Sequence, residues 1–377
     1  MTAFRDLGLA EPLLQALAVA GLATPTPIQT QAIPPILAGR DLIGIAQTGT
    51  GKTASFALPI LHRLLDSGAR AEPRTCQALV LAPTRELASQ ICDAIRTYAR
   101  RTALRATVLV GGVPKQKQAR ALAAGIDLVV ATPGRLLDHL SDGALRLDET
   151  RYLVLDEADH MLDLGFIDDV RRIAGRLPDQ RQSLLFSATM PAPIALLARQ
   201  LLRDPLTVAA TPPATTADKI DQRIVFAETQ QKRPLLIEML KRGRMKRTLV
   251  FTRTRQGADT LAAALDKAGI RVAAIHGDKS QPQRDRVLAE FRAGLFPVLI
   301  ATDVAARGID IPDLTHVVNF EIPEVPEAYV HRIGRTARAG ARGIAISLCA
   351  ASERSSLRDI EKLLATRLRV YDPRQAT

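Results

Sequence analysis

The chain has 377 residues, of which 47% are hydrophobic and 24% are charged, and this composition excludes wholesale disorder. Its length exceeds that of one typical hydrophobic core and indicates about two domains. No segment reaches the roughly 18 apolar residues that a membrane-spanning helix requires, and Met1–Ala10 lacks the apolar core of a signal peptide. We therefore expect a soluble protein of the cytoplasm.

The positive charge is unevenly distributed along the chain. The formal net charge is +12; residues 1–210 carry 23 Lys and Arg against 20 Asp and Glu, whereas residues 211–377 carry 28 against 19. The surplus in the second half favours a polyanionic partner. The alternative is a basic, soluble surface, and charge alone does not separate the two.

Three cysteines, Cys76, Cys92 and Cys349, are odd in number and widely scattered. No pair of them has the spacing of a zinc or redox site, so we expect no sulfur-bound metal. This pattern favours a reducing compartment.

Short apolar runs rich in β-branched residues recur along the chain and predict buried strands. In the first half they are Leu42–Ala46, Ala78–Ala82, Ala106–Val110, Asp127–Ala131, Tyr152–Leu155 and Ser183–Phe186. In the second half they are Thr248–Phe251, Val272–Ile275, Val298–Ala301, His316–Asn319 and Ile344–Leu348. Most do not alternate in polarity, which is typical of strands covered on both faces. Helical patterns between them, such as Glu86–Arg100 and Gly257–Ala268, favour an α/β fold with a parallel sheet, formed twice.

The boundary between the two halves is marked by Pro212 and Pro213 among small polar residues, the composition of a linker. We predict a first domain at residues 1–208, a linker at 209–219, a second domain at 220–370 and a short tail at 371–377.

A phosphate-binding loop is predicted at Ala46–Thr53, after the first strongly apolar strand. The loop ends in Gly-Lys-Thr, but Ala46 stands where the usual pattern has glycine. A helix that begins near Lys52 directs its N–H groups at a phosphate, so Lys52 is predicted to bind the β- and γ-phosphates and Thr53 a Mg²⁺ ion. The alternative, a surface turn rich in Gly and Thr, is disfavoured by the strand before the loop and the helix after it.

The acidic tetrapeptide Asp156–Asp159 follows the apolar run Tyr152–Leu155. Asp156 is predicted to bind the metal at the carboxyl end of a strand, where ligands of α/β proteins bind. Glu157 is predicted to orient and deprotonate the attacking water. The alternative, a helix N-terminus enriched in acids, is compatible with catalysis.

Taken together, these motifs resemble the DEAD-box ATP-dependent RNA helicases, whose namesake motif is Asp-Glu-Ala-Asp. The resemblance covers the chain from Phe4 to about Leu368, and phrases such as Ile43–Ala46 are most similar to the bacterial RhlE-like branch. The motifs that carry it are, in order, Pro27–Gln29, Ala46–Thr53, Pro83–Leu87, Gly111–Gly112, Thr132–Arg135, Asp156–Asp159, Ser187–Thr189, Val250–Phe251, His276–Gly277 with Gln281 and Arg284, Ala301–Asp310 and His331–Arg338.

The resemblance implies two tandem RecA-like lobes, each a parallel sheet flanked by helices, with ATP and RNA bound between them. Gln29 would bind the adenine edge, because an amide offers the donor and the acceptor that adenine requires. Leu22 departs from relatives that carry an aromatic residue there, which puts adenine affinity in doubt. The implied nucleotide-binding residues are Phe4, Gln29, Ala46, Gln47, Thr48, Gly49, Thr50, Gly51, Lys52, Thr53 and Asp310.

Arg335 and Arg338 resemble the arginine fingers of the family, which stabilise charge on the γ-phosphate. The alternative is a basic helix face that binds RNA phosphate. The hydroxyls of Ser187 and Thr189 resemble the pair that bonds Asp159 and links hydrolysis to lobe movement; a strand-end cap is the competing role. His331 and Arg332 are expected to tie their motif to the acids of the first lobe.

RNA contacts are expected mainly to the backbone and without sequence preference, because the chain is 3% aromatic and has no Trp for base stacking. The implied RNA-binding residues are Pro83, Thr84, Arg85, Gly111, Gly112, Thr132, Pro133, Gly134, Arg135, Gly277, Gln281, Arg284, Thr302 and Gly308.

The predicted activity is RNA-stimulated ATP hydrolysis coupled to local, non-processive unwinding of short RNA duplexes. An ATP-gated RNA clamp or platform with little unwinding is the alternative. A translocating DNA helicase is disfavoured by Gln29 and by the Ala158-Asp159 ending of the tetrapeptide. The partner classes that we expect are RNA and unidentified proteins of RNA degradation or ribosome assembly, and the chain is expected to be a monomer.

Overall fold

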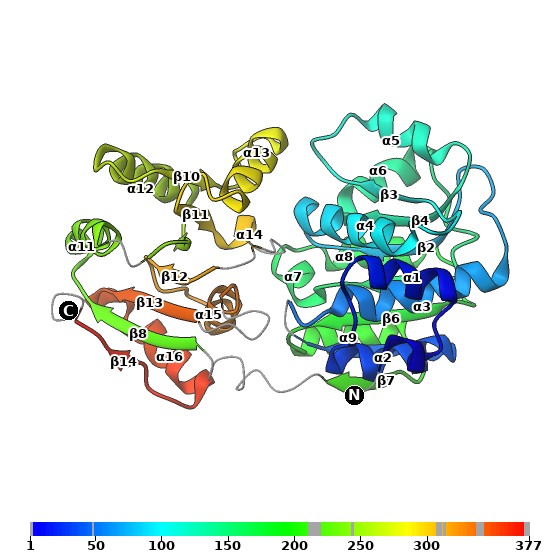
Figure 1. Ribbon diagram of the computed structural model, residues 1–377, viewed down its shortest axis with the longest axis horizontal. Coiled ribbons are helices and arrows are strands. Elements are labelled where there is room, and N and C mark those ends of the chain that lie inside the picture. Colours follow the sequence, from blue (N-terminus) through cyan, green and yellow to red (C-terminus); the bar gives the residue numbers. More distant parts are fainter. Residues whose placement is uncertain are drawn as a thin grey trace. The chain divides into compact units, whose positions relative to one another are not determined.

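The computed structural model describes residues 3–46, 49–209, 220–242, 245–306, 311, 314–336 and 343–372 (Figure 1). The chain divides into two compact units, Met1–Thr211 and Pro212–Thr377. The described part of the first unit ends with the strand Leu206–Ala209. The predicted domain and linker boundaries stay a prediction, because residues 210–219 lie outside the described ranges.

The first lobe is built on a seven-stranded sheet in the order β3-β4-β2-β5-β6-β1-β7, with all pairs parallel. Its strands are β1 (Leu42–Ile45), β2 (Cys76–Leu81), β3 (Ala106–Leu109), β4 (Ile126–Ala131), β5 (Tyr152–Leu155), β6 (Gln182–Ser187) and β7 (Leu206–Ala209). Its helices are η1 (Phe4–Leu7), α1 (Glu11–Val19), α2 (Pro27–Leu37), α3 (Lys52–Ser67), α4 (Arg85–Ala99), α5 (Lys115–Leu122), α6 (Pro133–Ser141), α7 (Ala158–Asp163), α8 (Ile167–Ala174) and α9 (Ala192–Leu201).

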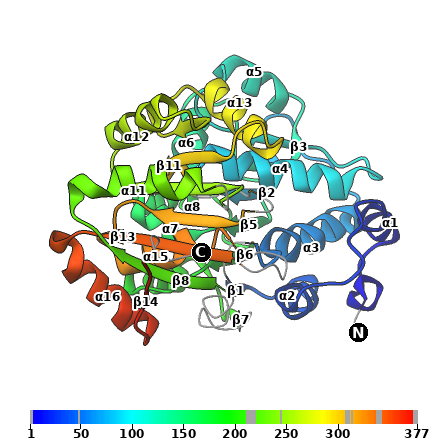
Figure 2. The ribbon, with the colours of Figure 1, turned by 60° about the vertical axis from the view of Figure 1, so that its left-hand side comes forward.

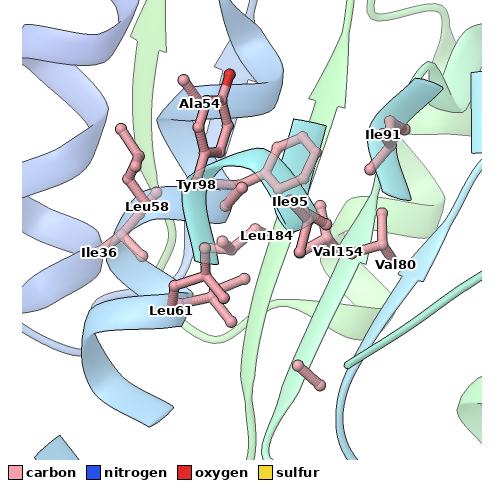
Figure 3. Packing of buried hydrophobic residues seen from close by; sticks show 14 of the residues in the cluster. Ile36, Ala54, Leu58, Leu61, Val80, Ile91, Ile95, Tyr98, Val154 and Leu184 are labelled. Carbon is pink, nitrogen blue, oxygen red and sulfur yellow. The ribbon is translucent and has the colours of Figure 1, made fainter. Parts of the chain in front are cut away.

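Two hydrophobic cores cover the two faces of this sheet. Val80 packs with α1 to α4, whereas its neighbour Leu81 packs with α6, α8 and α9, because successive residues of a strand point to opposite faces. Figure 3 shows the first of these cores. In the same core the rings of Phe56 and Phe186 lie 5.4 Å apart between centroids. Burial on both faces explains why the central strands are continuously apolar.

The second lobe repeats this architecture, with the strand order β10-β11-β9-β12-β13-β8-β14 and parallel pairing throughout. Figure 2 labels β11, β13, β8 and β14 of this sheet. Its strands are β8 (Ile220–Phe226), β9 (Thr248–Thr252), β10 (Val272–Ile275), β11 (Val298–Thr302), β12 (His316–Asn319), β13 (Gly343–Cys349) and β14 (Arg369–Val370). Its helices are α11 (Thr229–Lys241), α12 (Arg255–Lys267), α13 (Gln281–Arg292), α14 (Asp303–Ala306), α15 (Pro326–Ile333), η3 (Ala351–Glu353) and α16 (Arg354–Leu364).

The predicted α/β class and the two parallel sheets are confirmed. Every apolar run predicted as a strand forms one, but β7, β8 and β14 were missed. The missed strands lie at or beside a sheet edge, where residues are partly exposed, so no continuous apolar run marks them. The predicted helices α4 and α12 begin slightly earlier than expected. Their starts are set by Thr84 and Thr254, whose hydroxyls accept the N–H groups of Leu87 and Gly257.

Candidate functional site

The predicted phosphate loop joins the carboxyl end of β1 to the first turn of α3. Gly51 precedes α3 with φ at 94°, and a Cβ there would lie 2.4 Å from Nε2 of Gln29, so both the backbone and the packing require glycine. Ala46 is buried, and its N–H donates to the carbonyl of Ser187 at 3.0 Å. Gly49 and Thr50 lie in the turn before Gly51, Thr53 is the second residue of α3, and Gln47 and Thr48 lie outside the described residues.

Lys52 and Asp156 face each other in the first lobe with almost no exposure to solvent. Their side chains are 5% and 3% exposed, and Nζ of Lys52 lies 4.0 Å from Oδ1 of Asp156. Among the described residues, Nζ of Lys52 has no hydrogen-bond partner. Burial raises the pKa of Asp156 to about 6, against the opposing effect of the Lys52 charge. Within the described residues, the ammonium therefore lacks an acceptor, and burial opposes ionisation of the carboxylate more than the Lys52 charge favours it.

The donor groups near this pair fit a magnesium ion. Asp156 and the Thr53 hydroxyl offer oxygen ligands, which Mg²⁺ prefers, and the buried Asp156 carboxylate would gain a compensating charge. Within the described ranges no group of three or more His, Cys, Asp and Glu side chains could hold a metal. Mg²⁺ is commonly bound through one or two protein oxygens together with phosphate and water, and the oxygens of Asp156 and Thr53 suit this mode.

Glu157 adopts a left-handed backbone conformation, with φ at 54°, immediately before α7. Its N–H donates to Oδ1 of Asp156 at 3.0 Å, and its Oε2 lies 2.7 Å from Nδ1 of His160. Such strain in a residue other than glycine is typical of functional sites. His160 was missed in the sequence, although its position three residues after Glu157 on a helix was a usable signal.

Asp159 connects the end of β5 to the segment that follows β6. The backbone N–H and the hydroxyl of Thr189 both donate to Oδ2 of Asp159, each at 3.0 Å. The hydroxyl of Ser187 also contacts Asp159, where it accepts the backbone N–H at 3.2 Å. Both hydroxyls therefore bond Asp159, Thr189 at the carboxylate and Ser187 at the backbone N–H, and a role of these bonds in linking hydrolysis to lobe movement stays a prediction.

Gln29 contacts the phosphate loop directly. Its amide oxygen accepts the N–H of Thr26 at 2.8 Å, and its Nε2 donates to the carbonyl of Gly51 at 3.1 Å. An amide keeps one further N–H and one further lone pair, so adenine binding by Gln29 stays a prediction. Leu22 is 41% exposed, whereas Phe4 is 5% exposed and packs in the core. The predicted nucleotide contact of Phe4 stays a prediction.

The RNA-binding segments predicted in the first lobe follow β2, β3 and β4, which are neighbours in the sheet. Arg85 crosses over Gly111, where a Cβ would lie 2.8 Å from Nη2 of Arg85. Nη1 of Arg135 donates to the carbonyl of Val113 at 2.9 Å. The structure thus gathers these segments at the carboxyl edge of the sheet that also carries Asp156. They comprise Pro83, Thr84, Arg85, Gly111, Gly112, Thr132, Pro133, Gly134 and Arg135.

In the second lobe, Gly277 lies just after β10, and Thr302 ends the neighbouring strand β11. Gln281 and Arg284 lie in the first turn of α13. Nε2 of Gln281 donates to Asp285 at 2.9 Å. Gly308, Asp310 and Arg338 lie outside the described residues.

Arg332 is 1% exposed and is held inside the second lobe. Its Nε and Nη2 donate to the carboxylate of Asp303 at 2.5 and 2.7 Å, and Nη1 donates to Asn319 and to the carbonyl of Glu321. These contacts all lie within the second lobe, and the expected contact of Arg332 with acids of the first lobe stays a prediction. Arg335 is also buried and lies in the turn after α15. His331 lies in the last turn of α15.

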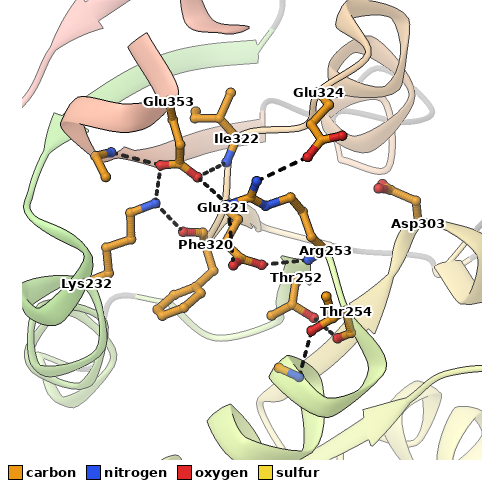
Figure 4. Close-up of polar contacts among 12 residues, drawn as sticks. Lys232, Thr252, Arg253, Thr254, Asp303, Phe320, Glu321, Ile322, Glu324 and Glu353 are labelled. Carbon is orange, nitrogen blue, oxygen red and sulfur yellow. Dashed lines mark hydrogen bonds and ion pairs between the residues drawn. The ribbon is translucent and has the colours of Figure 1, made fainter. Parts of the chain in front are cut away.

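Figure 4 shows a polar network in the second lobe that was not expected from the sequence and is centred on the buried carboxylate of Glu353. The carboxylate of Glu353 accepts the backbone N–H groups of Ile322 at 3.2 Å and Ala350 at 2.8 Å. It also binds the ammonium of Lys232 and, at 3.4 Å, the guanidinium of Arg253. The network joins α11, the loop after β9 and the start of α16.

Comparisons with known proteins agree with this arrangement. The family description "DEAD/DEAH box helicase" matches residues 26–197, and "Helicase conserved C-terminal domain" matches residues 231–340. DEAD-box ATP-dependent RNA helicase 30 of Arabidopsis thaliana is 43% identical over 382 residues, covering 99% of this chain and 64% of that protein. The helicase CshA of Geobacillus kaustophilus is 41% identical over 373 residues, covering 99% and 79%. This chain therefore spans just under two thirds of the Arabidopsis relative.

Solved structures give the same result. Dbp5 of S. cerevisiae bound to RNA and ADP BeF3 superposes with a TM-score of 0.90 at 32% identity, covering 99% of this chain and 96% of that one. Mss116p bound to ssRNA and AMP-PNP superposes with a TM-score of 0.89 at 28% identity, covering 99% and 80%. The relatives named here do not single out the RhlE-like branch, which stays a prediction. The two family matches and these relatives show that the chain belongs to the DEAD-box ATP-dependent RNA helicases, a family of ATP hydrolases that act on RNA.

Proposed function

We propose that this chain hydrolyses ATP in response to RNA and uses the cycle to separate short RNA duplexes locally and non-processively. The observation that carries the proposal is the buried pair of Lys52 and Asp156, with the strained Glu157 beside it, at one edge of the first sheet. Dbp5 and Mss116p, which share the fold, were solved with RNA and a nucleotide or nucleotide analogue.

The proposed roles at the phosphate follow from charge and burial. The ammonium of Lys52, which has no hydrogen-bond acceptor among the described residues, would bind the β- and γ-phosphates. Its charge is weakly screened in this buried site of low dielectric constant. Asp156 and Thr53 would hold Mg²⁺, which when bound neutralises phosphate charge. Glu157 orients the attacking water and accepts its proton, with its carboxylate held by His160. Arg335 and Arg338 are proposed to stabilise charge on the γ-phosphate.

The proposed link to RNA passes through Asp159. Asp159 precedes His160 and follows Glu157 by two positions in the sequence, and its carboxylate accepts two hydrogen bonds from Thr189. A change at the phosphate can therefore be passed through Asp159 to the segment after β6. RNA would bind through small, hydroxyl and cationic groups at the carboxyl edges of the sheets, mainly at its backbone. Such binding is independent of sequence and weakens with salt.

A strand-displacement assay tests the proposed mode of unwinding. We expect ATP-dependent separation of an RNA duplex of about 10 base pairs and little separation of one of about 30, because a local opening lowers stability only over a few base steps, each worth about 1.4 kcal/mol in the DNA duplex. ATP-dependent RNA binding without displacement of the short duplex would instead indicate a clamp. Efficient opening of the long duplex would contradict the non-processive mode.

We further propose that the protein acts as a monomer in the cytoplasm. The three cysteines, all buried and free, support a reducing compartment. In the described part of the chain, no helix is long and apolar enough to cross a membrane.

A further inference from the structure

A pocket of about 530 Å³ lies in the first lobe at the amino ends of β5 and β6, the end of the strands opposite to Asp156 and Ser187. Four arginines line it, Arg63, Arg151, Arg181 and Arg203, together with one acid, Asp66. We call it the arginine pocket. None of the residues assigned above to nucleotide or RNA lines it.

The four guanidinium groups lack acidic partners. Over the described ranges of the chain, no carboxylate lies within 4.0 Å of any of them. Other arginines of the same lobe do have such partners, for example Arg171, which pairs with Asp168 at 2.9 Å. In the part of the chain that the structure describes, the arginine pocket therefore gathers positive charge without a direct ion pair to any of its four arginines.

Two of the arginines are held in place by neutral oxygens. Nη1 of Arg63 donates to the carbonyl of Leu37 at 3.0 Å, and Nη1 of Arg181 donates to the carbonyl of Pro178 at 2.8 Å. These contacts fix the guanidinium groups without cancelling their charge. Arg151 and Arg203 are exposed. The pocket thus combines two positioned inner cations with two accessible outer cations.

Two further observations support an excess of positive charge. Burial lowers the pKa of Arg181, and the charge of Arg203 lowers it further, against the effects of Asp179 and Asp41. The first 210 residues are also nearly balanced, with 23 basic and 20 acidic side chains. A general basicity of the lobe does not explain the cluster.

We propose that the arginine pocket binds phosphate groups of an anion that carries at least two of them, independently of the nucleotide at the phosphate loop. Planar guanidinium groups bind phosphate oxygens through paired hydrogen bonds, and four of them around one pocket suit more than one phosphate group. The volume lies within the range of small-molecule sites, about 300–1,000 Å³. The phosphates could belong to a small free anion or to the backbone of RNA.

The test uses inorganic tripolyphosphate and the full chain saturated with ADP, so that the phosphate loop is occupied. Calorimetry should show one tripolyphosphate bound, and Arg151→Gln with Arg203→Gln should weaken that binding by about tenfold or more, since the substitutions remove two charge-assisted bonds to phosphate. The control, Arg171→Gln with Arg172→Gln, removes the same charge from exposed arginines on α8 and should change binding by less than about twofold. No binding by the unmodified chain, or an equal loss in the control, would overturn the proposal.

The source of the phosphates is then identified by competition. Displacement of tripolyphosphate by a long single-stranded RNA, in the unmodified chain but with no RNA effect on the pocket variant, assigns the site to the RNA backbone. Retention of tripolyphosphate in the presence of RNA assigns it to a small free anion. Basal ATP turnover of the pocket variant should equal that of the unmodified chain, which shows that the variant is folded.

Discussion

The ammonium of Lys52 and the carboxylate of Asp156 are buried together but lie 4.0 Å apart, beyond hydrogen-bond distance. Two opposite charges placed this way in a site of low dielectric attract each other, yet each keeps capacity for another partner. A triphosphate for the lysine and a divalent cation for the aspartate would satisfy both. The pair is thus arranged for a ligand more than for the stability of the lobe.

Lys52→Ala should weaken ATP binding by about tenfold or more, because a charge-assisted bond to phosphate contributes ~1.5–3 kcal/mol. Titration with a fluorescent ATP analogue measures the effect. Lys115→Ala is the control, since Lys115 is a partly exposed lysine of the same lobe that pairs with Asp142. Unchanged affinity of the Lys52 variant would contradict the assigned role.

Glu157→Gln should lower the ATP turnover number by about 10²–10⁴, because an amide cannot accept the proton of the attacking water. Binding of ATP and RNA should stay within about threefold, since the substitution keeps the shape of the side chain. Single-turnover hydrolysis and equilibrium binding separate the two effects. A variant that loses ATP affinity would show that Glu157 has a structural role.

Thr189→Ala should uncouple hydrolysis from strand displacement. The substitution removes the hydroxyl that donates to Asp159 but keeps the backbone N–H bond, so ATP turnover should change by only a few fold. Displacement of a short RNA duplex should fall by about tenfold. Thr189→Ser, which keeps the hydroxyl, should restore displacement; equal loss of turnover and displacement in the alanine variant would speak against coupling.

Lys232→Met should destabilise the second lobe by about 3 kcal/mol, because it removes a cation from the buried carboxylate of Glu353. Denaturation in urea measures the loss. The control is Arg242→Ala, which breaks the exposed pair with Glu238 and should cost less than about 1 kcal/mol. Adding Glu353→Gln to Lys232→Met should recover part of the loss, and a further loss of equal size would contradict the proposed pairing.

His316 should make the second lobe less stable in mild acid. Burial, with a smaller effect of the Arg223 charge, lowers the pKa of His316 from 6.5 to about 4. Below pH 6.5 His316 is protonated in the unfolded chain, whereas in the folded chain it stays neutral until about pH 4. The free energy of unfolding therefore falls as the pH decreases from 6.5 to about 4. Urea denaturation from pH 7 to pH 4 should show a shallower decline for His316→Gln; identical slopes would contradict this origin.

The sequence predicted those features that depend on neighbours along the chain. Tyr152–Leu155 is continuously apolar because β5 is buried on both faces. The acids that follow it lie at the carboxyl end of the strand, where the apolar run stops. The edge strands β7 and β14 lack this pattern because several of their side chains are exposed to solvent and need not be apolar. Features that depend on distant pairs could not be predicted: Glu353 meets Lys232 across 121 positions, and no local pattern connects them.

Residue roles show the same division. Asp159 and Thr189 belong to motifs that could be read from the sequence, and the structure brings them into contact. Arg332 and its partner Asp303 also lie in motifs that could be read from the sequence, but nothing in either motif indicates that the two pair, and only the folded second lobe reveals the contact. Phe4 has an aromatic ring suited to a base, yet its position in the core is decided by packing with α1 and α2.

The most direct test of the account is the rate of phosphate release from ATP with and without single-stranded RNA. We predict that saturating RNA raises the turnover number of the unmodified chain by about tenfold or more, a coupling of at least about 1.4 kcal/mol, and that the Glu157→Gln variant stays inactive in both conditions. A turnover number that RNA leaves unchanged would contradict the proposed coupling between the phosphate site and RNA.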